Sequence, residues 1–472
     1  MYIALSALAF TFIAWYRFHL GLAVLFVLLP TYLIRFNIGP LPTTVLEVMI
    51  GIVVAVWLVK MWNAQRETHN KNYLSLITYH LSHNKLLFIG IILLLTGATI
   101  SVATSLNLRA ALGEWKAFYI EPVLIFLILI TLKEKLSPIA YHLSRITYHV
   151  STINLILYGL LLSGLLTSIL AIYQHFTGFA VPYAFWENGN SYRVTAWYGF
   201  PNAVGLFLAP LLPFALYVVH QTFTILRTRD RRYVTGDNKN RIVYRLSLII
   251  PWLILILSLL FIPSSLIAIF YAKSTGALIG ILAGIFVLLL LYKKTRIASV
   301  IILASGILTL TLLPATNPIK QELFFQDRSG QIRVAMYKET LQFLKDHPIL
   351  GAGLASYTKR IEPYHTTVNG EGIEIFHHPH NIFLTMWVNT GIVGLAGFVL
   401  IIIWFYQTGL KCVEKLKIGN WKLEIPVLLA SMTTILVAGL VDSPYIKNDL
   451  ALLFWLLPAL MMANSHQQHQ IT

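Results

Sequence analysis

Apolar stretches long enough to cross a lipid bilayer recur along the chain, and this feature constrains the fold more than any other. A helical crossing takes about 17–25 residues. Hydropathy predicts such segments, the first two of them short, near residues 2–16, 20–34, 43–62, 86–105, 115–132, 152–175, 197–219, 247–271, 276–292, 298–314, 382–408, 426–441 and 449–463. We therefore expect an all-α polytopic membrane protein with about 12–13 transmembrane helices. The first segment lacks the features of a cleaved signal peptide, so we expect it to be retained.

Charged residues make up only 11% of the chain and hydrophobic residues 57%, whereas a soluble domain carries about 25% charged residues. So few charges do not cover the surface of the several soluble domains that 472 residues would otherwise form. The net charge of +16 would suit a nucleic-acid-binding protein. The basic residues lie in short runs between apolar segments, however, so no nucleic acid is expected as a partner. Cys412 is the single cysteine, which excludes an internal disulfide.

The basic connections predict the orientation in the membrane, because Lys/Arg-rich loops stay cytoplasmic. They follow every second apolar segment and lie at 60–85, 133–145, 220–246, 293–296 and 409–422. This pattern places the amino terminus outside, the carboxyl terminus inside and one long loop outside. We predict an amino-terminal transmembrane bundle (1–314), an extracytoplasmic loop (315–381) and carboxyl-terminal helices (382–472). Loops of this length are uncommon unless they carry function.

An amphipathic helix is predicted inside this loop. It follows Arg328-Ser329-Gly330 and ends near Asp346, because Pro348 disfavours helix at the residue before it. Its apolar residues recur at helical spacing and form one stripe: Ile332, Met336, Tyr337, Leu341 and Leu344. Arg333 lies beside the stripe, one turn before Tyr337. Arg333 is either an interfacial cation that extends toward water or a functional cation.

The loop ends in His377-His378-Pro379-His380-Asn381. This cluster lacks the i,i+4 spacing that places two histidines on one helix face, Pro379 prevents a helix through it, and no Cys, Asp or Glu is adjacent in sequence. We therefore predict no metal site. A histidine at the mouth of a membrane span is better suited to accept a proton. The alternative is an interfacial histidine without a role.

The same residues carry a family resemblance. His380-Asn381, nine residues, Gly391, two residues and Gly394 resemble the signature of the O-antigen ligase and O-antigen polymerase superfamily. Other motifs that resemble the family are Ser329-Gly330 with Arg333 four residues before an aromatic, Asp346-His347-Pro348, Gly351-Ala352-Gly353 and Phe200-Pro201-Asn202. The resemblance covers about residues 190–410.

One motif departs from the family. Members carry Ser-Arg-Gly before the loop, and that arginine is thought to meet the lipid diphosphate. Here the sequence reads Lys273-Ser274-Thr275-Gly276. Lysine keeps the charge but lacks the planar fork that suits phosphate. Either Lys273 binds phosphate as a point charge, or Arg193 or Arg328 has taken over the function.

The resemblance implies a GT-C-like, inverting membrane glycosyltransferase in the bacterial inner membrane, active on the periplasmic side. Its partners would be membrane lipid, a glycan donor linked to undecaprenyl diphosphate and an acceptor hydroxyl on a glycan, lipid or protein. His380 would be the base, and Arg333 and Lys273 would stabilise the diphosphate. The predicted substrate-binding residues are Arg328, Arg193, Asn381, Tyr337, His378 and Trp197. No cofactor, metal, nucleotide sugar or ATP is expected.

Several alternatives remain open. The aromatic stretch 183–200 is either a platform for sugar rings or a membrane-interface belt. A ligase, a repeat-unit polymerase and a protein O-oligosaccharyltransferase would share these motifs. A flippase for lipid-linked glycans would concentrate charged residues at the bilayer midplane, and a non-catalytic scaffold would not need the His/Arg/Lys set.

Overall fold

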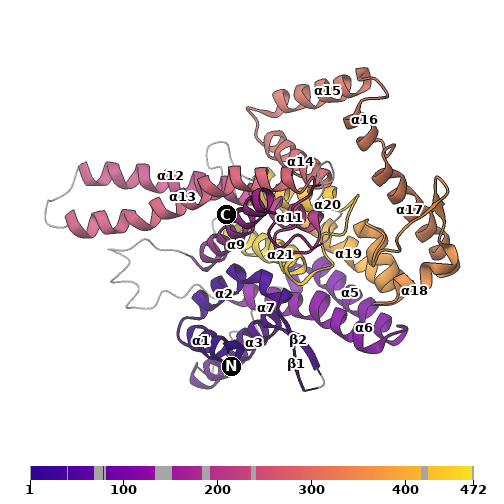
Figure 1. Cartoon of the computed structure of the whole chain (residues 1–472). Helices are drawn as coiled ribbons and strands as arrows, with labels where there is room; N and C mark the ends of the chain where they lie inside the picture. The colour runs from indigo at the N-terminus through magenta and orange to yellow at the C-terminus, as the bar shows by residue number, and fades with distance from the viewer. Residues whose placement is uncertain are drawn as a thin grey trace. The chain divides into compact units, whose positions relative to one another are not determined.

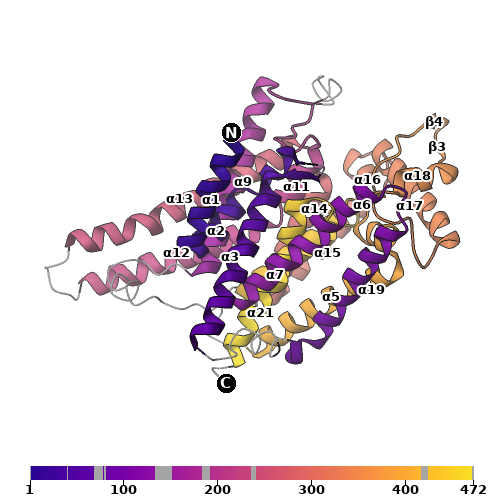
Figure 2. The same ribbon diagram turned by 90° about the horizontal axis from the view of Figure 1, so that it is seen from below.

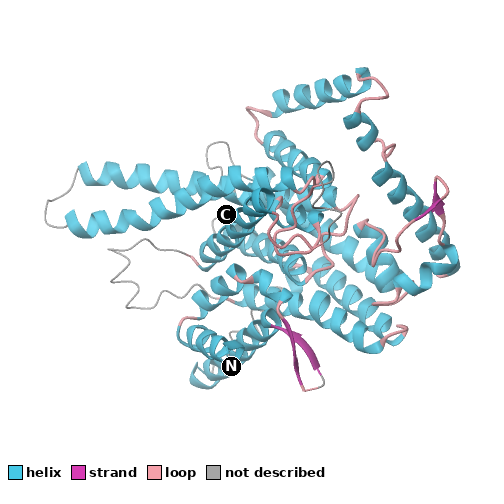
Figure 3. Ribbon diagram, viewed as in Figure 1, coloured by secondary structure: helices cyan, strands magenta, loops and turns pink. Residues whose placement is uncertain are grey.

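A computed structural model describes residues 2–39, 41–68, 78, 81–132, 151–182, 192–234, 241–415 and 424–469. Helices dominate these residues, and the strands form only two-stranded sheets (Figure 3). Six of the described helices are long and apolar enough to cross a membrane: Val45–Asn63, Lys85–Ala103, Thr152–Thr177, Pro201–Arg227, Ile249–Tyr271 and Ile382–Glu414. Shorter apolar helices cover further predicted spans. The structure confirms an all-α polytopic membrane protein. The total of about 12–13 spans stays a prediction from the hydropathy pattern.

The chain divides into two compact units, residues 1–74 with 125–281 (unit 1) and residues 75–124 with 282–472 (unit 2). The predicted basic connection 133–145 lies outside the described residues, as do 235–240 and 416–422 of two others. The predicted orientation therefore stays a prediction.

Unit 1 is built around α9 (Thr152–Thr177), which packs against α2 (Phe18–Val27) and α13 (Arg241–Tyr271). Its other elements are α1 (Tyr2–Tyr16), η1 (Leu29–Leu33), β1 (Arg35–Ile38), β2 (Leu41–Thr44), α3 (Val45–Thr68), α11 (Pro201–Leu208), α12 (Leu211–Val234) and most of α7 (Glu121–Thr131) (Figure 1). Within the predicted span 20–34 the helix is not continuous. The α-helix ends at Val27, a 3₁₀ turn containing Pro30 follows, and residues 35–38 then pair with residues 41–44 as antiparallel strands.

Unit 2 is built on the pair α5 (Lys85–Ala103) and α19 (Ile382–Lys415), which lie side by side in Figure 1 and Figure 2. The approach requires glycine: a Cβ at Gly97 would lie 2.5 Å from the backbone nitrogen of Gly394. Small residues permit such close helix packing in membranes. The other elements are α6 (Leu108–Glu114), the π-helix η2 (Trp115–Ile120), α15 (Arg296–Leu312), α16 (Pro318–Leu323), α17 (Arg328–Asp346), α18 (Tyr357–Ile361), η5 (Glu362–Tyr364), β3 (Thr367–Val368), β4 (Glu371–Gly372), α20 (Glu424–Ala438) and α21 (Asn448–His469). The helix α14 (Thr275–Leu291) contributes to both units.

The predicted loop helix is confirmed as α17, with the Asp327 carboxylate accepting backbone N–H bonds at its start. The predicted apolar stripe is wrong in part. Leu341 is 45% exposed, whereas Glu339 and Thr340 are buried. Glu339 tolerates burial because its carboxylate accepts bonds from the backbone and hydroxyl of Thr366, at 2.8 and 2.6 Å. The buried face of α17 is therefore rotated relative to the one expected from hydropathy.

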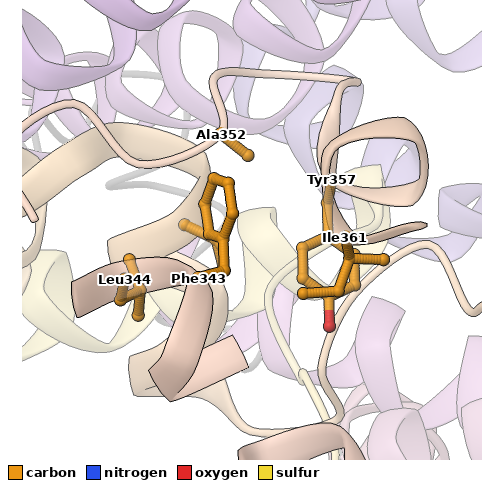
Figure 4. Close-up of a cluster of buried hydrophobic side chains, with 6 residues drawn as sticks. Phe343, Leu344, Ala352, Tyr357 and Ile361 are labelled. Atoms are coloured by element: carbon orange, nitrogen blue, oxygen red, sulfur yellow. The ribbon is translucent and has the colours of Figure 1, made fainter. Parts of the chain in front are cut away.

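A hydrophobic cluster joins α17 to the segments that follow it (Figure 4). Its buried members are Phe343, Leu344, Ala352, Tyr357, Ile361 and Val388. The Tyr357 hydroxyl also lies 2.8 Å from the Thr340 hydroxyl. The loop is thus a packed element with its own core.

The segment after α17 docks onto a break in α19. Gly391 has φ +67° and ψ −177°, which interrupts the helix. A Cβ at Gly391 would lie 2.3 Å from the Ile349 carbonyl oxygen, and the Ile392 backbone N–H donates to that oxygen at 2.9 Å. Gly391, separated from Asn381 by nine residues, therefore serves chain packing. Further along, the Glu114 carboxylate accepts from the Ala355 backbone N–H at 2.9 Å.

Candidate functional site

The candidate site lies in unit 2, where the end of the loop 315–381 meets the connection between α20 and α21. Asn381 joins these segments. Its side-chain oxygen accepts from the backbone N–H groups of Phe383 and Leu384 and so caps α19. Its side-chain nitrogen donates to the Leu440 carbonyl at 3.1 Å. One residue thus starts the helix and fixes the neighbouring connection.

His380 pairs with Asp442. The distance from its Nδ1 to Asp442 Oδ1 is 3.2 Å, and side-chain exposures are 19% and 10%. The same carboxylate oxygen accepts from the Ser443 backbone N–H at 2.8 Å. His380 has φ +47°, a conformation that is uncommon outside glycine and that concentrates at functional sites. The fold therefore holds this imidazole in a defined orientation.

The pairing with Asp442 favours one tautomer of a neutral His380 ring. Burial acts to raise the pKa of Asp442, but the attraction and hydrogen bond of His380 outweigh it and hold that pKa below its usual range. An ionised carboxylate only accepts hydrogen bonds. The hydrogen of a neutral His380 ring is thereby assigned to Nδ1, which leaves the lone pair at Nε2. Nε2 is then a proton acceptor.

His378 lies beside the pair. Its Nδ1 accepts from the His380 backbone N–H at 3.3 Å, and the two ring centroids are 4.6 Å apart. Burial lowers the pKa of His378 to about 3, and His380 acts in the same direction. His378 therefore stays neutral and supports the backbone at His380.

Arg333 and Tyr337 hold the site from α17. Arg333 Nε donates to the Val441 carbonyl at 3.0 Å, and its Nη1 donates to the Ser329 hydroxyl at 2.7 Å. The Tyr337 hydroxyl lies 2.9 Å from the His380 carbonyl and 3.0 Å from that of Leu440. Burial raises the pKa of Tyr337 to about 12, so it remains a donor. Arg333 Nη2 has no hydrogen bond to the residues that the structure describes.

Arg193 and Lys273 form a separate group in unit 1. Arg193 Nε donates to the Ala272 carbonyl at 2.9 Å, and its Nη2 lies 2.7 Å from Asn202 Oδ1 and 3.1 Å from the Lys273 carbonyl. Lys273 has φ +49°. The Phe-Pro-Asn and Lys-Ser-Thr-Gly motifs, distant in sequence, therefore meet through Arg193.

The two remaining predicted site residues are Arg328 and Trp197. Arg328 pairs with Glu371 at 2.5 Å on the surface, where the side chains are 75% and 65% exposed. Trp197 lies in unit 1, in the turn before α11, and its Nε1 has no hydrogen-bond partner within the described part of the chain. Of the aromatic stretch, residues 183–191 lie outside the described residues. Unit 2 thus brings together His380, His378, Asn381, Arg333 and Tyr337 of the residues predicted from sequence.

Sequence reasoning did not find Asp442. This residue lies 62 positions after His380, in a short polar connection between two apolar helices. The signal available was the run Asp442-Ser443-Pro444 at that boundary. An acidic residue at the mouth of a membrane helix is a functional candidate.

Part of the chain matches a known protein family. The family described as O-antigen ligase matches residues 257–399, which include Lys273, Arg333 and His380. The match ends before Asp442 and begins after Arg193. No curated protein matches the chain. The match at residues 257–399 supports a relationship of this part of the chain to the O-antigen ligase superfamily.

Proposed function

We propose that the protein is a membrane glycosyltransferase that moves a glycan from undecaprenyl diphosphate to an acceptor hydroxyl at the outer face of the bacterial cytoplasmic membrane. The observation that carries the proposal is the His380–Asp442 pair held beside Arg333. The family match supports a ligase-type or polymerase-type activity.

In the proposed reaction, His380 Nε2 takes the proton from the acceptor hydroxyl. The acceptor oxygen forms a bond to the anomeric carbon as the bond from that carbon to the diphosphate oxygen breaks. The electron pair leaves with undecaprenyl diphosphate, and attack opposite the leaving group inverts the anomeric carbon. Asp442 stabilises the imidazolium that forms.

The leaving diphosphate requires positive charge. Arg333 supplies a guanidinium whose Nη2 is not engaged by the described residues, and fixed cations in a site that excludes water stabilise developing negative charge strongly. On the strength of its sequence motif, Lys273 is also proposed as a phosphate-binding cation; within unit 1 its backbone carbonyl accepts from Arg193. Because fixed cations perform this role, the proposed reaction requires no metal.

The test uses the purified full chain with an undecaprenyl-diphosphate glycan and acceptor, in EDTA. Wild type should transfer glycan. His380→Ala should slow transfer by about 10²–10⁴-fold, the range for a lost proton acceptor, and Arg333→Ala by about 10²–10³-fold, the range for a lost group that stabilises developing charge. His377→Ala is the matched control, because His377 is exposed and three residues away. Undiminished transfer in His380→Ala, or loss of wild-type transfer with EDTA, would contradict the mechanism.

The acceptor distinguishes the alternatives within this class. Transfer to the growing glycan indicates a repeat-unit polymerase, transfer to a lipid-borne glycan indicates a ligase, and transfer to a protein hydroxyl indicates an O-oligosaccharyltransferase. Movement of the lipid-linked glycan across a vesicle bilayer without a new glycosidic bond would indicate a flippase instead.

A further inference from the structure

Three side chains of the candidate site have the chemistry of a transition-metal site. One ring nitrogen of His378, one of His380 and a carboxylate oxygen of Asp442 lie within 4.8 Å of one another. Ligand bonds to Zn²⁺ are about 2.0–2.2 Å, so two ligands of one tetrahedral ion lie roughly 3.4 Å apart. Inward shifts of about 1 Å would bring all three atoms onto one ion.

The surroundings fix the backbone that carries these ligands. Tyr337 contacts the His380 carbonyl, and Arg333 binds the carbonyl of Val441, next to Asp442. The Ser443 N–H holds one carboxylate oxygen of Asp442. Neighbouring groups therefore hold the backbone of two of the three ligands, as is common where surrounding hydrogen bonds orient metal ligands.

The ligand set selects the kind of ion. Two imidazoles and one carboxylate suit Zn²⁺ and similar borderline ions, and a fourth coordination position stays open. Mg²⁺ and Ca²⁺ prefer oxygen ligands, and this group offers one carboxylate.

We propose that His378, His380 and Asp442 bind Zn²⁺ or a chemically similar divalent ion, and that the bound ion blocks glycan transfer. Coordination through His380 Nδ1 displaces the hydrogen from that atom, so a neutral ring carries it on Nε2 and no longer accepts a proton. Coordination through Nε2 occupies the proton acceptor directly. The block rests on the proposed function, whereas binding of the ion does not.

Binding is tested by calorimetric titration of Zn²⁺ into the purified full chain without a polyhistidine tag, in buffer free of chelators. His378→Ala and Asp442→Ala should each weaken the tightest site by at least about 10–100-fold, the effect of losing even a residue that only hydrogen-bonds to a metal ligand. His377→Ala should keep it, because His377 is an exposed neighbour outside the group. Equal binding by all variants, or loss of binding in His377→Ala, would overturn the site.

The block is tested by adding Zn²⁺ to the transfer assay. Wild-type transfer should stop and return with EDTA, and residual transfer by His378→Ala should resist Zn²⁺. Zn²⁺ binding at the tight site with undiminished transfer would overturn the block. Absence of transfer even in EDTA would overturn the proposed function, and the calorimetric result would still decide the metal site.

Discussion

Replacing Asp442 with Asn tests whether the carboxylate positions the proton acceptor. The substitution keeps the shape and removes the charge that holds His380. The Nδ1–Oδ1 distance is 3.2 Å and both side chains are largely buried. A charge-assisted hydrogen bond contributes about 1.5–3 kcal/mol. Because 3.2 Å is longer than the preferred 2.7–2.9 Å, we expect a loss of about 1.5–2.5 kcal/mol, which corresponds to about 10–70-fold in rate.

The assay measures kcat and KM for the donor with purified Asp442→Asn. Since Asp442 acts through His380, kcat should fall while KM stays nearly constant. Asp346→Asn is the control, because Asp346 is an exposed carboxylate of the same loop that accepts from the Tyr364 hydroxyl at 2.6 Å, as an Asn oxygen also could. If Asp442→Asn, with an unchanged melting temperature, transfers glycan as fast as Asp346→Asn, the positioning argument is refuted.

Three further substitutions probe the fold around the site. Gly391→Ala should lower the melting temperature by the equivalent of roughly 1–3 kcal/mol, because φ is positive and the Cβ meets a carbonyl; Gly113→Ala, where a Cβ meets nothing within 4 Å, should not. Burial raises the pKa of Glu114 from 4.5 to about 7, so the neutral carboxyl favours the folded state. Up to about 3 kcal/mol of the free energy of unfolding is lost as pH rises through that range. The melting temperature should therefore fall from about pH 4.5 to about pH 7 in wild type and not in Glu114→Gln, and an equal fall in both would contradict this reasoning. Phe343→Ala should cost about 3–5 kcal/mol in the loop cluster and speed proteolysis of the loop, whereas Leu341→Ala, 45% exposed in wild type, should be cleaved like the parent.

Local sequence patterns predicted a large part of the fold. Apolar length predicts a membrane helix because each residue in lipid must satisfy its backbone hydrogen bonds within the same segment. The end of α17 near Asp346 followed from Pro348, since proline restricts the residue before it. The apolar stripe did not predict that Glu339 is buried, because the partner that satisfies its carboxylate, Thr366, lies on a later segment of the chain.

The sequence alone determined the helical membrane class and the extent of the loop helix, and its motifs identified His380 and Arg333 as candidate site residues. Only the tertiary structure joined His380 to Asp442, 62 residues away, and Arg193 to the Lys273 carbonyl, 80 residues away. Periodicity and turn chemistry act over a few residues and can be read along the chain. The partner of a buried polar group is set by which segments pack together, so the chemistry of this site became visible only with the fold.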